Sequence, residues 1–474
     1  MVMDFPGKNK MLRYISAAYE KEESGLLVLY GEAGLGKTSL LQELMKRYDQ
    51  AFYYQAVPAS ERQQAAFLCR EMFPEAEMPS FPTFEDVLRK YAFEAKQKQL
   101  LMIDEFDHMM RSGESFMEEI TKLVTGAYTE QHFLIVLCSS NLGFVANSMG
   151  RKMGRAAFMI KGLLKMKEYS YYDIRSLCGA EDRELTFCRY ALMGGRPAAI
   201  QTSLCYDSLK DIICEMYLDR NGMFYDYGIR YIGENLREPN VYATILYMIA
   251  NGYAKLNDLY RYTGFSRAKI SVYLKNLIEL DLVEKVYSYG AEARDDSRKG
   301  IYRITNPMIR FWYRFIYEHR NKLEFMEKEA FYKAYIQNQL DEYLEYSYAK
   351  VAAQLLSEGM IKELPKAVKC EEWVGKSGDI PVIALPEQEK QSENAIREQG
   401  KPFMIFTKRA QAVTQEDLDW YRFCVRKAGI SYDHMIVFTE KGVDMASEGV
   451  FSAQNTDAPE SIQIVSLFEN ILEQ

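Results

Sequence analysis

A glycine-rich segment, GEAGLGKTS (31–39), constrains the fold of this chain more than any other feature of its sequence. It follows the apolar run GLLVLY (25–30), which predicts a strand buried on both faces, and it precedes a helical pattern. Gly31, Gly34 and Gly36 allow the backbone to curl so that its N–H groups converge on phosphate oxygens, and the N-terminus of the helix adds positive potential. We therefore expect a phosphate-binding P-loop.

The polar residues at the end of this loop define the expected ligands, ATP and Mg²⁺. Lys37 is expected to bridge the β and γ phosphates, and the hydroxyl of Thr38 to take one coordination position of Mg²⁺. The predicted nucleotide-binding positions of the loop are Gly31, Gly34, Leu35, Gly36, Lys37, Thr38 and Ser39.

A second motif, QLLMIDEFDHM (99–109), predicts a buried strand that ends in acids. Asp104 is placed to hold Mg²⁺, and Glu105 to polarise the attacking water as a general base, so Glu105 and Lys37 are the predicted catalytic residues. Adjacent acids on one strand point to opposite faces, which separates these two roles. Asp107 is interpreted as a helix cap. The alternative is a solvated acidic strand end without chemistry.

Three further apolar runs, 51–57, 132–140 and 155–163, predict strands, and 83–96 predicts an amphipathic helix. Together with the two motifs they indicate an open α/β sheet that binds its ligand at the carboxyl ends of the strands. The strand over 132–140 ends in the polar residues Ser139, Ser140 and Asn141, which are expected to contact the γ-phosphate or the attacking water.

The motifs together resemble the archaeal-type ATPases of the STAND class, which also occur in bacteria. The resemblance extends over nearly the whole chain and includes DFPGKNKML, GEAGLGKT, LLMIDEFD, LCSSN, GRKMGRAAFMIKGL, ALMGGRPAAI, GFSRAKISVYLKNLIELDLVEK and KGIYRITNPMIRFWYRFIY. It implies an ASCE-type P-loop sheet with a helical lid, a winged helix-turn-helix and a C-terminal α/β domain related to PD-(D/E)XK nucleases. The expected boundaries are 1–165, 166–236, 237–320 and 321–474.

The resemblance also implies three nucleotide contacts outside the two motifs. Pro197, in GGRP, corresponds to a proline near the adenine, although a helix-ending glycine pair followed by a proline explains the same letters. Arg155 matches an arginine near the last strand that senses the γ-phosphate, with Arg151 as its neighbour, and a surface arginine is the alternative. Lys8 and Met11 replace an arginine and a glutamate that are usual in the family.

Residues 241–252, 255–264 and 266–280 predict three short helices, followed by strands over 282–288 and 300–305. This order is typical of a winged helix.

In the third helix, Ser266 is the expected cap. Its apolar positions Ile270, Leu274, Leu277 and Ile278 are expected to face the core. Its basic positions Arg267, Lys269 and Lys275 are left outside, where a recognition helix meets the major groove of double-stranded DNA. Residues 240–305 contain ten Lys and Arg against seven Asp and Glu, a local charge of +3. That charge favours DNA only modestly, so a spacer or protein-contact module remains the alternative.

The C-terminal domain matches only part of the nuclease motif. Asp379 and Lys408 match the aspartate and the lysine, whereas Phe406 and Ala349 stand where glutamates are usual. A lone carboxylate binds a divalent ion poorly, so we expect a folded but inactive nuclease relative that contacts a protein partner. Residues 386–400 are interpreted as a polar connection. The aromatic run FWYRFIY (311–317) is interpreted as core rather than a base-stacking platform.

The overall composition fits a multi-domain, soluble, cytoplasmic chain without a membrane segment. It has 474 residues and a net charge of −8, and its eight cysteines form no CxxC pair. We predict an ATP-hydrolysing switch that alternates between ATP and ADP and hydrolyses slowly. The alternatives are a DNA-binding regulator with a structural nucleotide and a nucleotide-gated nuclease.

Overall fold

The computed structural model describes residues 6–75, 81–110, 115–179, 182–291, 300–376, 378–387, 401–444 and 462–472. The chain divides into two compact units. The first comprises Met1–Tyr169 together with Arg196–Ala199, and the second comprises Ser170–Gly195 together with Ile200–Gln474.

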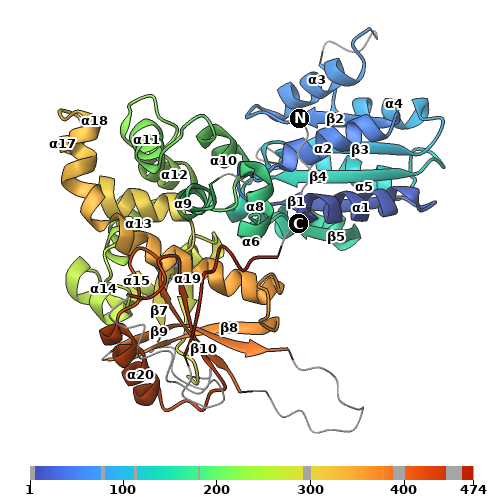
Figure 1. Cartoon of the computed structure of the whole chain (residues 1–474). Helices are drawn as coiled ribbons and strands as arrows, with labels where there is room; N and C mark the ends of the chain where they lie inside the picture. The colour runs from blue at the N-terminus through green and yellow to red at the C-terminus, as the bar shows by residue number, and fades with distance from the viewer. Residues whose placement is uncertain are drawn as a thin grey trace, which may run out of the picture. The chain divides into compact units, whose positions relative to one another are not determined.

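The first unit contains a five-stranded sheet in the order β2-β3-β4-β1-β5, and all of its strands run parallel (Figure 1). The central strands β1, β3 and β4 are almost entirely buried, as their continuous apolar sequences predict. The expected open α/β sheet is therefore confirmed. The strands are β1 (Gly25–Tyr30), β2 (Ala51–Gln55), β3 (Gln99–Asp104), β4 (Phe133–Ser139) and β5 (Ile160–Lys165).

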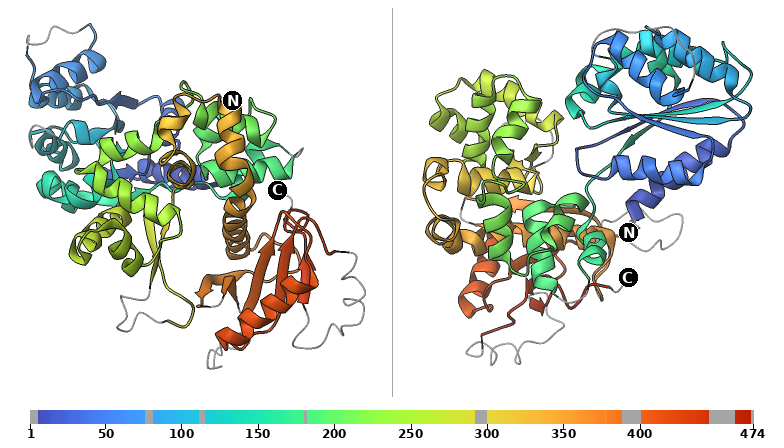
Figure 2. Two further views of the ribbon diagram at one scale, coloured as in Figure 1. Left: turned by 90° about the vertical axis from the view of Figure 1, so that its left-hand side faces the viewer. Right: turned by 90° about the horizontal axis from the view of Figure 1, so that it is seen from above.

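Helices cover both faces of this sheet (Figure 2). Three of them share one core with alternate residues of β1, β3 and β4. They are α3 (Glu61–Met72), α4 (Phe84–Glu94) and α5 (Ser115–Val124). Thr83 starts α4 with a capping box, close to the expected start of the helix. On the other face, Tyr14 of α1 (Pro6–Glu20) and Leu27 pack against Gly162.

The last strand of this sheet begins later than expected. Residues Gly154–Met159 form the 3₁₀ segment η2, and β5 starts only at Ile160. Strand β5 is an edge strand that pairs with β1, and its first residues alternate between partly buried and exposed. The apolar residues of 155–163 therefore did not show where the strand begins.

The second unit begins with a series of helices. They are α8 (Tyr171–Cys178), α9 (Arg183–Met193), α10 (Pro197–Ser203, whose first residues belong to the first unit), α11 (Leu209–Ile213) and α12 (Tyr227–Asn235).

The predicted winged helix follows and is confirmed. It contains α13 (Pro239–Ala250), α14 (Leu256–Thr263), α15 (Arg267–Glu279) and the antiparallel strands β6 (Val283–Val286) and β7 (Ile301–Ile304). Ser266 caps α15, and its hydroxyl accepts a hydrogen bond from the Lys269 N–H at 3.2 Å. Ile270, Leu274 and Leu277 are buried as predicted, but Ile278 is exposed, which corrects its assignment to the core. Leu280, just beyond the helix, is buried instead.

The aromatic run 311–317 lies in the core, as predicted. It forms the end of α16 (Pro307–Phe311) and the π-helical turn η4 (Trp312–Ile316). Trp312 and Tyr313 are fully buried, and the indole of Trp312 donates to the carbonyl oxygen of Tyr225 at 2.9 Å. These rings are therefore unavailable for stacking on bases.

The C-terminal part contains the long helix α19 (Leu340–Glu358) and a sheet in the order β12-β11-β10-β9-β8. Strand β10 pairs antiparallel with β9 and parallel with β11. Helix α20 (Gln415–Ala428) packs against this sheet (Figure 2). The strands are β8 (Ala367–Val374), β9 (Asp379–Pro386), β10 (Phe403–Lys408), β11 (Met435–Thr439) and β12 (Ile462–Val465).

The expected C-terminal α/β domain is present, although the resemblance did not fix its individual strands. Strands β8 and β9 form an antiparallel hairpin whose turn falls at the glycines of segment 371–385. Strand β12 and helix α20 were not predicted. Most of the polar connection at 386–400 lies outside the described residues.

All eight cysteines are free thiols. In the parts of the chain that the structure describes, no helix combines the length and the apolar character needed to cross a bilayer.

The packing of Trp312 on α12 gives a test of this fold. A Cβ at Gly228 would overlap the indole ring of Trp312, whereas a Cβ at Gly233 of the same helix meets no atom within 4 Å. We expect Gly233→Ala to stabilise the second unit by about 0.5–1 kcal/mol through helix propensity, and Gly228→Ala to destabilise it by about 1–3 kcal/mol through overpacking. Urea unfolding of both variants measures this difference, and an equal effect would contradict the packing.

Candidate functional site

The glycine-rich loop between β1 and α2 (Lys37–Arg47) has the form of an anion-binding cradle. Gly34 and Gly36 adopt left-handed conformations with φ of 82° and 93°. Gly31 lies so close to the carbonyl of Met166 that a Cβ would collide with it. No side chain caps α2 at Gly36, so the first N–H groups of this helix are available to phosphate oxygens. The loop geometry therefore fits a nucleotide phosphate.

Lys37 is the buried cation of this cradle. The residue is only 4% exposed, and its ammonium group donates to the carbonyl oxygens of Gly31 and Glu32, at 2.7 Å each. Burial lowers the pKa of this ammonium group, and nearby carboxylates oppose the shift. The two carbonyl dipoles compensate the positive charge of Lys37 only in part, and a polyphosphate would supply the remaining negative charge.

Asp104, at the end of β3, lies beside Thr38 on α2. The Thr38 hydroxyl donates to Asp104 Oδ2 at 2.8 Å, and the Tyr53 hydroxyl reaches the same oxygen at 3.1 Å. A carboxylate next to a hydroxyl at the foot of a phosphate cradle is a donor set that suits Mg²⁺. Burial and the Asp104 carboxylate raise the pKa of Tyr53, so its phenol remains a protonated donor. Nothing in its sequence context indicated Tyr53.

Glu105 occupies a different position from the one expected. Strand β3 ends at Asp104, and Glu105 adopts a left-handed turn with φ of 50° and ψ of 43°, so the two acids do not alternate along a strand. This conformation is unfavourable for a non-glycine residue by about 1 kcal/mol or more. Its carboxylate accepts hydrogen bonds from the hydroxyl of Ser140 and, at 2.9 Å, from its N–H. The end of β4 therefore orients Glu105.

Asp107 and Asn141 form a second link between the same strand ends. Asp107 is buried within the 3₁₀ turn η1 (Phe106–His108), where it accepts from the Ser139 hydroxyl at 2.8 Å and from the Asn141 amide at 3.5 Å. It thus joins β3 to β4, a role beyond the helix cap expected from sequence. The amide oxygen of Asn141 caps α6 (Leu142–Asn147). Both ends of this amide are engaged, so a phosphate contact would have to displace a bond.

Arg155 and Arg151 lie on exposed segments. Arg155 belongs to η2 and Arg151 to α7 (Met149–Met153), and both are exposed. Within the described residues neither makes a hydrogen bond or an ion pair with the P-loop. Their predicted role as γ-phosphate sensors remains a prediction.

Pro197 is the first residue of α10, and Gly194, with φ of 65°, ends α9. The alternative interpretation of GGRP, a glycine that ends one helix and a proline that starts the next, is therefore present in the structure. A contact of Pro197 with adenine stays a prediction.

Arg196, the residue just before Pro197, contributes to the site in a way that the sequence did not indicate. Arg196 is 3% exposed and forms ion pairs with Glu32 of the P-loop and, at 2.8 Å, with Glu168. The compact unit of the P-loop accordingly includes Arg196–Ala199. We call these three side chains the Glu32–Arg196–Glu168 clasp. The sequence contained only two separate signs of this clasp, an acid at the second position of the glycine loop and an arginine in the distant GGRP segment.

Lys8 also approaches this site. Its side chain is buried, and its ammonium group donates to the Ser39 hydroxyl at 3.1 Å. The lysine that replaces the usual arginine thus contacts the first turn of α2.

The nuclease-like residues of the second unit form no metal site. Asp379 opens β9 and Lys408 ends β10, but Lys408 is paired with Asp417 of α20. Phe406 is buried and stacks on Tyr421 at 4.3 Å, and Ala349 is buried in α19. Among the residues that the structure describes, no cluster of three or more His, Cys, Asp or Glu side chains could hold a metal ion.

The basic residues of α15 point outward, as predicted. Arg267, Lys269 and Lys275 are exposed, and Arg267 lies over the ring of Tyr260 at 4.9 Å. Most of the wing loop, residues 292–299, falls outside the described residues.

The clasp gives a measurable prediction. Glu32 and Arg196 are both nearly buried, so removing either charge leaves the other poorly compensated. A double-mutant cycle of Glu32→Gln and Arg196→Gln should give a coupling energy of about 1–3 kcal/mol in urea unfolding. The exposed pair Glu43 and Arg47, 3.9 Å apart, is the control and should give less than about 0.5 kcal/mol. Additive effects at Glu32 and Arg196 would contradict the clasp.

Comparison with known families identifies three domains. Residues 20–142 match the family described as an AAA domain, and residues 243–285 match the bacterial regulatory proteins of the arsR family. Residues 312–395 match a family of archaeal and bacterial proteins of unknown function. The resemblance predicted from sequence is confirmed for this combination of domains.

The chain is also similar to individual proteins. An uncharacterised protein of Methanocaldococcus jannaschii is 23% identical over 395 residues, which cover 82% of this chain and 86% of that protein. A Walker-type ATPase of Pyrococcus abyssi is 14% identical, with a TM-score of 0.48 over 65% of this chain and 95% of the other. The ORC2 protein of Aeropyrum pernix, solved with ADPNP and ADP, is 13% identical, with a TM-score of 0.43 over 70% and 95% of the two chains.

Proposed function

We propose that this chain, which combines a P-loop ATPase domain of the AAA type with an arsR-type winged helix and a domain of unknown function, is an ATP-hydrolysing switch of the STAND class. Its nucleotide state would control contacts of the winged helix and the C-terminal domain with DNA or a protein. The observation that carries this proposal is the position of Lys37, which is buried against two carbonyl oxygens of the P-loop beside the acids that end β3.

The side chains of the site suggest how hydrolysis would proceed. Lys37 would exchange its bonds to the loop carbonyls for the β and γ phosphates of ATP. Thr38 and Asp104 would hold Mg²⁺, which neutralises charge on the phosphates. Glu105, oriented by Ser140, would accept a proton from the attacking water. The left-handed turn at Glu105 brings its carboxylate onto Ser140, and a strained backbone at such a position favours a role in chemistry.

The clasp suggests how a change of the bound nucleotide would be transmitted from the P-loop to other residues. Glu32 offers its backbone carbonyl to Lys37 and its carboxylate to Arg196, so a movement of Lys37 toward phosphate changes the bonding of the residue that holds Arg196. The chain enters the second unit on both sides of Arg196–Ala199. We place the domain boundaries at 1–165, 166–236, 237–320 and 321–474, with the C-terminal domain inactive as a nuclease because Phe406 and Ala349 replace ligands.

Turnover of ATP tests this assignment. We expect Lys37→Ala and Glu105→Gln each to lower the rate of hydrolysis by on the order of 100-fold or more, because they remove phosphate charge stabilisation and the general base. Glu105→Gln should still bind ATP at the P-loop, whereas Lys37→Ala should lose ATP binding at that loop. The matched control is Glu118→Gln, an exposed acid of α5, which should hydrolyse ATP at the rate of the unaltered protein. Hydrolysis by all three at that rate would contradict the assignment.

The exposed basic face of α15 favours duplex DNA as the partner that responds to nucleotide. If Lys275 contacts phosphate, Lys275→Glu should weaken duplex binding and lower the slope of log affinity against log salt by about 1. Lys427→Glu, an exposed change on α20, is the control. Duplex binding that responds to neither change would favour a protein partner. Duplex binding equal with ATP and ADP would favour the regulator with a structural nucleotide.

A further inference from the structure

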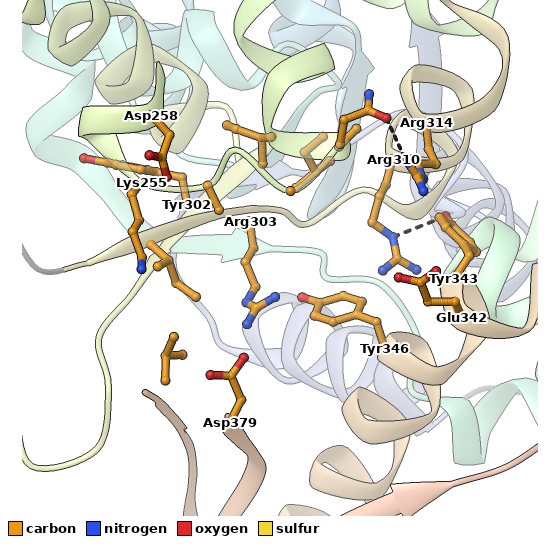
Figure 3. A pocket seen from close by; sticks show the side chains of 18 of the residues that line it. Lys255, Asp258, Tyr302, Arg303, Arg310, Arg314, Glu342, Tyr343, Tyr346 and Asp379 are labelled. Atoms are coloured by element: carbon orange, nitrogen blue, oxygen red, sulfur yellow. Dashed lines mark hydrogen bonds between the residues drawn. The ribbon is translucent and has the colours of Figure 1, made fainter. Parts of the chain in front are cut away.

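A cavity of about 490 Å³ lies wholly within the second unit (Figure 3). Its walls come from the end of α13, the start of α14, strand β7, the α16–η4 segment, helix α19 and the start of β9. Its volume falls within the usual range for small-molecule sites, roughly 300–1,000 Å³. Neither the P-loop nor the outward face of α15 contributes to it, so the proposed ATPase site does not account for it.

Within the described residues, Arg310 and Arg314 on one side of this cavity form no ion pair with a carboxylate, although the exposed Glu342 lies on the same side (Figure 3). Arg310 donates to the hydroxyls of Tyr343 and Ser347, at 3.2 and 2.6 Å. Arg314 donates to the amide oxygens of Asn251 and Gln339, at 2.6 and 2.7 Å. Within the described residues, each hydrogen bond of these two guanidinium groups goes to a neutral oxygen. Arg303, by contrast, is paired with Glu372 through two bonds, at 3.0 and 2.6 Å.

Tyrosine rings hold the guanidinium groups of Arg310 and Arg303 in place. Arg310 lies over Tyr343 and Tyr346, at 4.1 and 4.4 Å, and Arg303 lies over the same Tyr346 ring at 5.0 Å. Because the rings and the neutral acceptors fix Arg310 in advance, an anion that binds it does so without the cost of ordering a long side chain. This arrangement is typical of sites that bind a phosphate or a carboxylate.

The acids of the cavity limit what else the ligand carries. Figure 3 shows Arg310, Arg314 and the acid Glu342 on one side, Lys255 and Asp258 on the other, and Arg303 with Tyr346 between them; Asp379 lies below Arg303. A ligand that is anionic throughout would meet the carboxylates of Asp258 and Asp379. A ligand with one anionic end and hydrogen-bond donors at the other end satisfies both sides. A nucleotide has this chemistry, because the amino groups of its base donate to carboxylates.

We propose that this cavity binds a nucleotide, with its phosphate on Arg310 and Arg314 and its base toward Asp258 and Asp379. The same chemistry is offered by a free nucleotide and by the phosphorylated end of a nucleic-acid strand. The two sources differ in whether chain beyond the first nucleotide is needed for binding.

The test uses the full chain with Lys37→Ala, in EDTA, so that the P-loop and its Mg²⁺ contribute no binding. The probes are nucleoside 5′-monophosphates, a 5′-phosphorylated dinucleotide, and the same dinucleotide without the phosphate, each followed by calorimetry. We expect binding that requires the phosphate. Tight binding of the monophosphates identifies a free nucleotide as the source, and binding of the phosphorylated dinucleotide alone identifies a strand end.

Side-chain changes then locate the binding. Arg314→Gln should weaken it by at least about tenfold, as the loss of a charge-assisted hydrogen bond implies, and the exposed control Arg426→Gln should leave it within about twofold. Glu342→Gln removes the negative charge of an exposed acid beside the arginines and should therefore strengthen binding. This variant tests the location of the site if Arg314→Gln fails to fold. Absence of binding by all three probes, binding indifferent to the phosphate, or no response to Glu342→Gln and Arg314→Gln would overturn the proposal.

Discussion

The burial of the Lys37 ammonium group against two backbone carbonyls is the interaction around which the proposed nucleotide site is built. Lys37 lies at the start of α2, where two carbonyl oxygens of the P-loop hold it at 2.7 Å. Burying a cation is costly unless it is hydrogen-bonded and faces negative charge, and carbonyl dipoles supply only part of that charge. Two acids lie nearby, Asp104 at the end of β3 and Glu105 directly after it, but they accept hydrogen bonds from Thr38 and Ser140. A polyphosphate chain would supply the negative charge that this arrangement lacks.

The same loop connects the site to the remainder of the chain through Glu32. This residue bonds Lys37 with its carbonyl and Arg196 with its carboxylate, and Arg196 belongs to a segment of four residues by which the chain returns briefly to the ATPase unit. Arg196 directly follows Gly195 of the second unit, and the chain returns to that unit at Ile200. In the switch proposed above, a ligand would shift the equilibrium only by its differential contacts with the two states, and the clasp would be one such contact.

Most of the fold and the two nucleotide motifs could be predicted from the sequence, because each rests on local rules. A continuous apolar run predicts β1, β3 and β4, and glycine spacing predicts the loop before Lys37. The turn at Glu105, the burial of Arg196 against Glu32 and the hydroxyl of Tyr53 on Asp104 could not be predicted. Each depends on tertiary contacts between residues far apart in the chain, or on strain that those contacts maintain. The prediction that Ile278 is buried was also wrong, because burial depends on tertiary packing: Ile278 is exposed, and Leu280 is buried.

Equilibrium titration of the full chain with ATP and Mg²⁺ in a calorimeter measures whether the P-loop around Lys37 binds an adenine nucleotide. We expect one P-loop site in each chain, with an affinity that falls strongly when Mg²⁺ is removed and a signal that disappears when Lys37 is replaced by alanine. A titration in which ATP produces no saturable binding, or binds equally well to the alanine variant, would contradict this expectation.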